Sequence, residues 1–181
     1  MRFDAGALAA HFSVGFDHAA RRLVSLQRIN ATGPGFFVLT VDGAGHALER
    51  LGARGFPAGR FGGGCGKLPL HDLTARPGET RVRFGEMQGG ARFLMVSYGI
   101  APQPHGHAMP LPRRALLLGL DATEAEATVY GGTAAARDPI PIGLGCRVCE
   151  RQGCPVRAEP AITRPAGLDE WTLGPTPWDF Q

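Results

Sequence analysis

The chain has 181 residues, of which 44% are hydrophobic and 19% are charged, and its formal net charge at pH 7 is +3. This length supports one substantial hydrophobic core, and the mixed composition excludes an intrinsically disordered chain. No run approaches eighteen apolar residues, and residues 1–4 carry charge instead of opening an apolar stretch. Neither a membrane span nor a signal peptide is therefore expected, and the resulting expectation is a cytoplasmic protein.

Residues 5–28 carry apolar side chains at helical spacing on both sides of a Ser-Val-Gly turn at 13–15. We predict that residues 1–30 form a helix pair, which contacts a second copy of the chain or another partner. The pattern also resembles a helix-turn-helix, in which Arg21, Arg22 and Arg28 would contact DNA phosphates. A complete helix-turn-helix domain needs a third helix, which the following residues do not offer. We therefore expect no sequence-specific DNA binding by this chain alone.

The spacing of the apolar residues changes after residue 35. Strands are predicted at 36–41 and 46–51, joined by a turn at Asp42-Gly43, and again at 81–87 and 92–98. Residues 113–120 fit a strand or a buried helix, residues 121–126 contain good helix formers, and residues 128–130 favour a short strand. These elements predict an α+β fold with a mostly antiparallel sheet of about five or six strands. Residues 31–162 form this domain, and residues 163–181 form a tail with tryptophans among prolines.

The cysteines predict a metal site. Three of the four in the chain, Cys146, Cys149 and Cys154, fall within nine residues, and Cys65 lies at the end of a glycine-rich loop at 52–66. Four thiolates are the ligands that a zinc ion or an iron–sulfur cluster needs. Disulfides are disfavoured in a chain without a secretory signal. We predict that these four cysteines bind one metal centre, in a cysteine-rich loop that closes the sheet.

The spacing favours a [4Fe–4S] cluster and leaves zinc as the alternative. One C-x2-C hook, a nearby third cysteine and a remote fourth suit a cube in which each iron takes one thiolate, whereas structural zinc sites usually pair two hooks. Arg147, Arg151 and Arg157 alternate with the sulfurs and would offset the negative charge of either centre. His71 follows Cys65 by six residues and is expected beside the site, because four ligands are already present.

No catalytic constellation is visible in the sequence. It contains neither G-x-S-x-G nor H-E-x-x-H, and its serines, Ser13, Ser25 and Ser97, lie inside predicted structural elements. We therefore expect a protein that is not an enzyme.

Three segments carry a resemblance to a known family. They are C-R-V-C-E-R-Q-G-C-P-V-R-A-E-P-A at 146–161, F-G-G-G-C…H-D at 61–72, and L-A-A-H-F-S-V-G-F-D-H-A-A-R-R-L-V-S-L-Q-R at 8–28. Together they resemble the C-terminal sensing domain of bacterial short-chain fatty acyl transcriptional regulators of the XRE class. In that family a helix-turn-helix and a region related to IrrE-type metallopeptidases usually precede the sensing domain.

The resemblance implies a sensor domain with a sheet similar to the GAF type. Its signal would be an acyl-CoA, another small effector or the metal centre itself. The sequence departs from the family in showing neither its helix-turn-helix domain nor its H-E-x-x-H, and the resemblance implies that residues 8–28 match the end of the middle region. The family pattern has an aromatic residue near Leu68 and an asparagine near Pro69, so a pocket built on those residues is expected to differ in this chain.

Two hypotheses for the function follow. In the first, a regulatory domain of a transcription regulator uses a [4Fe–4S] cluster to report redox state, oxygen or iron. In the second, the domain binds an acyl-CoA-like effector and a structural zinc ion stabilises the fold. In both, regulation acts through a DNA-binding regulator or a second copy of the chain.

Overall fold

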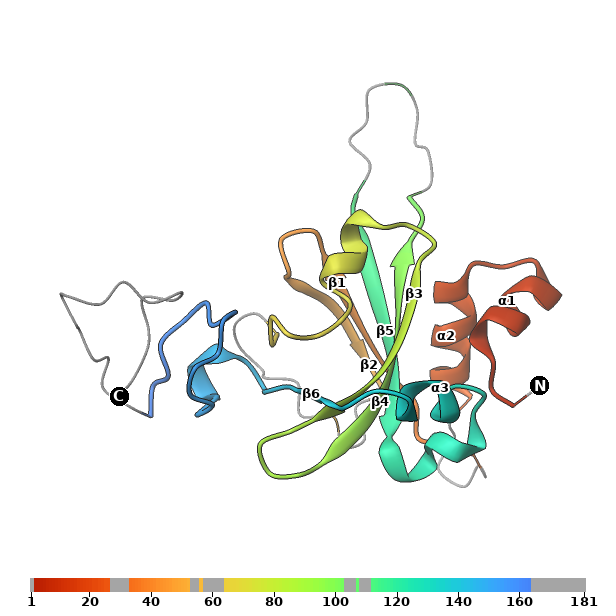
Figure 1. Ribbon diagram of the computed structural model, residues 1–181. Helices are drawn as coiled ribbons and strands as arrows, with labels where there is room; N and C mark the ends of the chain where they lie inside the picture. The colour runs from red at the N-terminus through yellow and green to blue at the C-terminus, as the bar shows by residue number, and fades with distance from the viewer. Residues whose placement is uncertain are drawn as a thin grey trace.

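A six-stranded sheet forms the centre of the computed structural model, which describes residues 2–26, 33–52, 56, 64–102, 107 and 112–163 (Figure 1). The strand order is β2-β1-β5-β4-β3-β6, and every neighbouring pair is antiparallel except β3 and β6. The strands are β1 (Phe37–Asp42), β2 (Ala47–Leu51), β3 (Thr80–Glu86), β4 (Arg92–Ile100), β5 (Arg114–Asp121) and β6 (Ile140–Pro141). The predicted α+β class and the mostly antiparallel sheet are confirmed.

The helices around this sheet are short. They are α1 (Ala5–Phe12), α2 (Phe16–Ser25) and α3 (Gly131–Ala135), with 3-10 helices η1 (Asp72–Ala75), η2 (Ala122–Ala127) and η3 (Cys146–Val148). Among the described residues, no helix is long and apolar enough to cross a membrane.

Two hydrophobic cores cover the two faces of the sheet, because successive side chains of a strand point to opposite faces. Val38 and Leu118 belong to the core on the helix side, whereas Leu39 and Leu117 belong to the core on the other side. The central strands are therefore buried on both faces, which accounts for their nearly continuous apolar sequence. The same alternation explains why residues 113–120, which fit either a strand or a buried helix, form β5.

The predicted helix pair is present, and it packs on one face of the sheet (Figure 1). The Asp4 carboxylate begins α1 by accepting the N–H groups of Gly6 and Ala7 at 2.9 and 3.0 Å. Ser13 ends it in the left-handed conformation, with φ of 53°. The apolar side of α2 enters the core on the helix side through Phe16, Ala20, Leu23 and Val24. This burial, more than intrinsic helix propensity, holds so short a helix in place.

An ion-pair network ties α2 to the edge strand β2. Arg21 donates to Asp17 at 2.7 Å and to Glu49 at 2.8 Å. Burial raises the pKa of Asp17, but the hydrogen bond and charge of Arg21 outweigh it, so this pKa lies below its ordinary value. The Arg21 guanidinium is therefore engaged inside the domain, whereas Arg22 is exposed. Arg28 lies outside the described residues.

The short strand predicted at 128–130 is wrong. The Thr128 hydroxyl donates to the carbonyl of Ala125 at 2.7 Å and closes a turn after η2, and α3 begins at Gly131. A Cβ on Gly131 would lie 2.7 Å from the Ala125 oxygen, so the turn packs too closely for a side chain there. Local hydrogen bonding by the threonine hydroxyl therefore outweighs the β propensity of the segment.

Strand β6 was not predicted, because two residues that include a proline give almost no periodic signal. Ile140 and Pro141 pair in parallel with Gly85 and Glu86 of β3, and the N–H of Ile142 donates to the Glu86 carbonyl at 2.9 Å. This pairing attaches the cysteine-rich segment to one edge of the sheet (Figure 1). The tail predicted at 163–181 lies outside the described residues from residue 164 onward.

Candidate metal centre and adjacent pocket

Cys65 is held in a compact turn that packs on the sheet. The carbonyl of Cys65 accepts the N–H of Leu68 at 3.0 Å, and the carbonyl of Leu68 accepts the N–H of His71 at 3.3 Å. Leu68 and Leu70 are buried in the core opposite the helices, with exposures of 4% and 0%. These leucines fix the turn and leave Cys65 itself only 9% exposed.

The cysteine hook comes from the other end of the chain. Ile142, which is fully buried, fixes the segment that follows β6, and η3 then begins at Cys146. The N–H of Cys149 donates to the carbonyl of Cys146 at 3.3 Å, which closes the hook as a tight turn.

Gly143 brings the sulfur of Cys65 close to that of Cys149. The backbone N–H groups of Lys67 and Gly143 are near enough to the Cys65 thiol to lower its pKa. A Cβ on Gly143 would lie 2.9 Å from the Cys149 sulfur, so the missing side chain makes room for that thiol. Two cysteines that are far apart in the sequence therefore border the same glycine.

The remaining two cysteines lie in the same segment. The Cys146 sulfur accepts the N–H of Ala158 at 3.4 Å. Cys154 lies two residues before Val156, whose backbone oxygen is 3.3 Å from the position of a Cβ on Gly66. The segment around Cys154 thus packs directly against the residue that follows Cys65 in the chain.

Burial raises the pKa of the Cys65 thiol. The neighbouring Cys149 and Cys146 raise it further by like-charge repulsion, and the N–H groups of Lys67 and Gly143 offset part of the increase. Without a metal ion, this thiol is therefore protonated at neutral pH. A bound cation would reverse the balance, because a coordinating thiol is deprotonated.

The four cysteines are free thiols. Within the described ranges, no three His, Cys, Asp or Glu side chains stand close enough to enclose a metal ion. The four cysteines gather in one region without forming a closed cage. The donor set is sulfur alone, which suits an iron–sulfur cluster or a structural zinc ion.

The three arginines of the cysteine segment differ in their contacts. Arg151 donates to the carbonyls of Ile142 and Glu86 at 3.2 and 2.9 Å, which anchors the segment to the end of β3. Arg157 is 6% exposed and donates to several backbone carbonyls of the segment. Arg147 is exposed.

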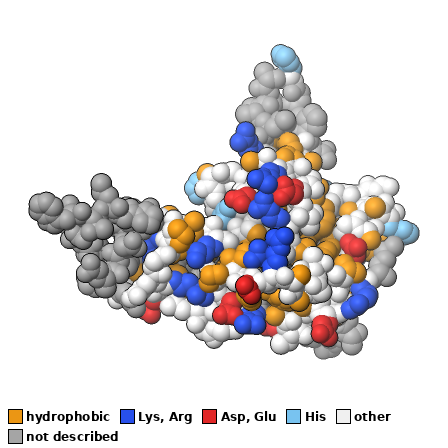
Figure 2. Space-filling view, in the orientation of Figure 1, with side chains coloured by type: hydrophobic (Ala, Val, Ile, Leu, Met, Phe, Trp, Pro, Cys, Tyr) orange, Lys and Arg blue, Asp and Glu red, His pale blue; other side chains and the backbone are white. Residues whose placement is uncertain are grey.

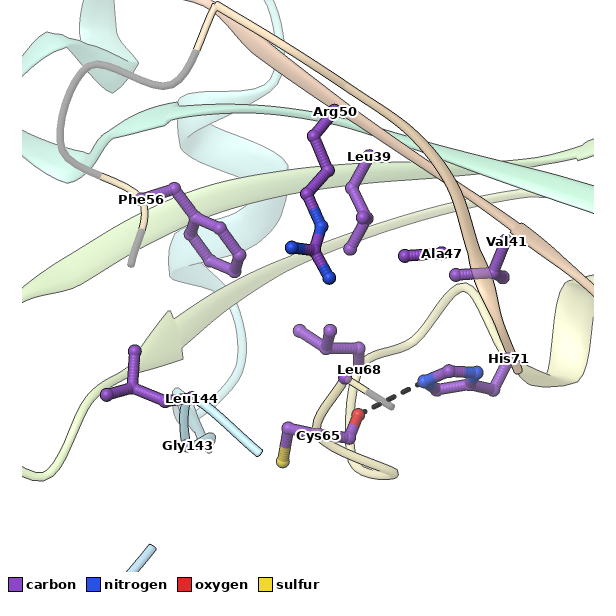
Figure 3. Close-up of a pocket in the computed structure, with 11 residues that line it drawn as sticks. Leu39, Val41, Ala47, Arg50, Phe56, Cys65, Leu68, His71, Gly143 and Leu144 are labelled. Atoms are coloured by element: carbon purple, nitrogen blue, oxygen red, sulfur yellow. Dashed lines mark hydrogen bonds between the residues drawn. The ribbon is translucent and has the colours of Figure 1, made fainter. Parts of the chain in front are cut away.

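His71 contacts the backbone of Cys65 through one ring nitrogen, as Figure 3 shows. Its Nε2 lies 3.1 Å from the Cys65 carbonyl oxygen, and because a carbonyl only accepts, Nε2 carries the hydrogen. Burial lowers the pKa of His71, although the contact with Cys65 acts in the opposite direction. The Cys65 sulfur points away from this histidine (Figure 3). His71 is therefore a neutral residue that supports the backbone of the turn.

A small pocket adjoins Cys65, between the β1–β2 hairpin and the turn at 64–71 (Figure 3). Its lining is mostly apolar and includes Leu39, Val41, Phe56, Leu68 and Leu144, with the polar groups of Arg50 and His71. Cys65 and Gly143 line the pocket as well, so the pocket and the cysteine region share residues.

Two residues of this pocket, Arg50 and Phe56, were not expected there from the sequence. Arg50 of β2 lies opposite Leu39 of β1, so the two side chains share one face of the sheet. The alternation of side chains along β2 was the sequence signal that could have placed Arg50 on this face. Phe56 follows no such pattern. It is held by stacking on Phe37, with ring centroids 4.5 Å apart, and by an edge contact with Phe93 at 5.2 Å.

Comparisons with known proteins identify the class of protein to which the chain belongs. A solved structure described as a Mycobacterium tuberculosis transcriptional regulator superposes with a TM-score of 0.85 and 31% sequence identity, covering 98% of this chain and 55% of that one. The chain is thus similar over its whole length to part of a transcription regulator. The family described as "Short-chain fatty acyl coenzyme A regulator, C-terminal" matches residues 25–178, and the chain belongs to this family.

Curated relatives agree with this assignment. The chain is 36% identical over 174 residues to the HTH-type transcriptional regulator RamB of Mycobacterium tuberculosis, and 32% identical over 173 residues to PrpR of the same organism. It is 31% identical over 180 residues to the propionyl-CoA carboxylase regulator of Cereibacter sphaeroides. These matches cover 93%, 94% and 99% of this chain, but 37%, 36% and 39% of the relatives. The chain therefore corresponds to little more than a third of each relative.

Proposed function

We propose that this chain is a sensor domain in which Cys65, Cys146, Cys149 and Cys154 bind a [4Fe–4S] cluster that reports redox state, oxygen or iron. The observation that carries the proposal is the shared contact at Gly143, which adjoins the sulfurs of both Cys65 and Cys149. The cluster would supply a one-electron redox couple and a labile, oxidant-sensitive centre.

The arrangement of the fold is part of this proposal. In it, the cysteine-rich segment closes the face of a GAF-like sheet opposite the helix pair. Supporting contacts come from Leu68 and Ile142, which join the same hydrophobic core from the two cysteine-bearing segments. The core thereby links the two halves of the donor set before any metal is bound.

An alternative is that the domain binds an acyl-CoA-like effector and that zinc occupies the cysteine site as a structural ion. The residues beside Cys65 supply an apolar lining with one arginine, but the pocket they enclose would have to open to admit an acyl chain. The description of the family and the name of the Cereibacter sphaeroides relative point to the same class of effector.

Anaerobic purification, followed by reconstitution with iron and sulfide, separates the two candidates. We expect a brown protein with broad visible absorption and about four iron and four sulfide ions per chain, because a [4Fe–4S] cube takes one thiolate per iron. A colourless protein that holds about one zinc ion per chain and rejects iron would contradict the cluster and favour the alternative.

We propose further that DNA contact in the regulator is made outside this chain. It would come from a DNA-binding partner, such as the XRE-class helix-turn-helix and IrrE-related region of the family, or from a second copy of the chain. Basic side chains gather down the middle of the face in Figure 2, with acidic side chains beside some of them. Arg81 and Arg92 pair with Asp72 and Glu86, and such pairing reduces the number of arginines available for phosphate contacts.

Titration of this chain with promoter fragments and scrambled DNA at physiological salt is expected to show no sequence preference. Any weak binding at low salt should weaken in Arg22→Ala, whose arginine is exposed, and change little in Arg21→Ala, whose guanidinium is held by Asp17 and Glu49. Tight, sequence-dependent binding that both substitutions abolish would restore the helix-turn-helix interpretation.

A further inference from the structure

Arg157 is a buried cation in the middle of the cysteine segment. Only 6% of its surface is exposed, and arginine is rarely buried to this extent unless it is paired or hydrogen-bonded. Its Nη1 donates to the carbonyls of Cys146 and Glu159 at 3.0 and 3.5 Å. Its Nη2 donates to the carbonyls of Cys149 and Arg151 at 3.0 and 2.6 Å. One guanidinium thus contacts four carbonyls, two of which belong to the cysteines of the hook.

These contacts fix the shape of the hook. The carbonyls of Cys146 and Cys149 leave the turn in the directions that the planar guanidinium requires, so their side chains are restricted as well. Loss of these hydrogen bonds would leave either a buried charge or several buried carbonyls without partners, and both would cost free energy of folding. The carbonyl contacts of Arg157 are thus made in a structure that holds no metal ion.

The charge of Arg157 acts on the same site. A cluster bound by four thiolates is negatively charged overall, and a buried cation in the turn that carries two of the sulfurs stabilises that charge. Reduction adds one more negative charge, so a nearby cation favours the reduced state. Arg151 acts elsewhere, because its side chain donates to the carbonyls of Ile142 and Glu86 and anchors the segment to β3.

We propose that Arg157 is the positioning residue of the cysteine site. Its hydrogen bonds to the carbonyls preassemble the hook, and its charge raises the reduction potential of the bound cluster. This inference rests on the proposed function for its second part. The first part concerns the metal-free protein and stands by itself.

Three variants separate the contacts from the charge. Arg157→Lys keeps the charge and loses the planar donor fork, and Arg157→Gln loses both. Arg147→Gln removes a cation from the same segment at an exposed position, and serves as the matched comparison. In each metal-free protein, the labelling rate of every cysteine is measured with a limiting amount of a disulfide reagent and peptide mass spectrometry. In each reconstituted protein, the cluster content and the reduction potential are measured.

In the metal-free proteins, Cys146 and Cys149 should react at least about tenfold faster in both Arg157 variants than in wild type, because hydrogen bonds from a charged donor are worth more than a factor of ten. Arg147→Gln should change these rates less than about twofold. In the loaded proteins, Arg157→Gln should have a more negative potential than wild type, whereas Arg157→Lys should remain close to it. A purely structural role would not separate the lysine from the glutamine variant in this way.

Labelling rates in both Arg157 variants that equal those of wild type would overturn the positioning role. Equal potentials in wild type and Arg157→Gln would overturn the role of its charge. If Arg157→Gln fails to fold by circular dichroism, the lysine variant decides the first part, and its loss of labelling protection is the expected result. A wild-type protein that takes up no cluster contradicts the proposed function and removes the second part, while the labelling rates still decide the first.

Discussion

Replacing Cys65 by serine is expected to lower the metal content and the thermal stability together. In the proposed site, metal binding by all four thiols would join the turn that carries Cys65 to the C-terminal hook and would therefore be linked to folding. Loss of one ligand should bleach most of the visible absorption and lower the melting temperature by roughly 5–10 °C, corresponding to a few kcal/mol for a domain of this size. Iron and zinc analysis, with calorimetry of the loaded protein, provides the measurement.

The same substitution in the metal-free protein is the control. Serine is close to cysteine in size, and the backbone N–H groups of Lys67 and Gly143 near the thiol remain available to a hydroxyl. The metal-free wild-type and Cys65→Ser proteins should therefore melt within a few degrees of each other. Full metal occupancy together with an unchanged melting temperature in the loaded variant would show that Cys65 is not a ligand.

Replacing Gly99 by alanine is expected to destabilise the domain at the point where η1 packs on the sheet. A Cβ at this position of β4 would lie 2.2 Å from the carbonyl oxygen of Arg76 and 2.6 Å from that of Leu73. Because backbone atoms cannot rotate away as a side chain does, η1 must move off the strand. We expect the free energy of unfolding to fall by about 1–3 kcal/mol in urea titrations.

Gly89→Ala is the matched control, since a Cβ there meets nothing within 4 Å and the residue is exposed. Its unfolding free energy should remain within about 0.5 kcal/mol of wild type. The Gly99 substitution should also increase the labelling rate of Cys65, because η1 continues the turn that carries this cysteine. A variant that keeps wild-type stability would show that η1 is not packed on β4 as described.

The sheet and the helix pair were predictable because their signals are local. The turn at Asp42-Gly43, the alternation of basic and apolar residues around Arg81 and Arg83, and the helical spacing before Ser25 all persist over several residues. The errors fall where a short segment follows tertiary contacts. Thr128 is drawn into a turn by the Ala125 carbonyl, and Ile140 becomes a strand residue only because β3 has a free edge there.

For the candidate site, the sequence gives the donor atoms but not their surroundings. The count and spacing of the cysteines predict a shared site, whose ligands stay a prediction. The sequence does not indicate that Gly143 adjoins both Cys65 and Cys149, because this contact depends on where β6 attaches to the sheet. Nor does spacing distinguish Arg157 from Arg147, although one is buried and the other is exposed. Burial and long-range packing decide which charges act on a site, and neither leaves a periodic pattern in the sequence from which it could be predicted.

The separation of the helix pair from the cysteine segment constrains how a signal can travel. The two lie on opposite faces of one sheet, with Val38 and Leu118 facing the helices and Leu39 and Leu117 facing the cysteine side. Adjacent residues of a single strand thus contact the cysteine side and the helix side. A displacement of β1 or β5 at one face would therefore also move side chains on the other face. For the proposed sensor, the strand backbone would then be the coupling element, and substitutions that stiffen or loosen it would change the response without touching either surface.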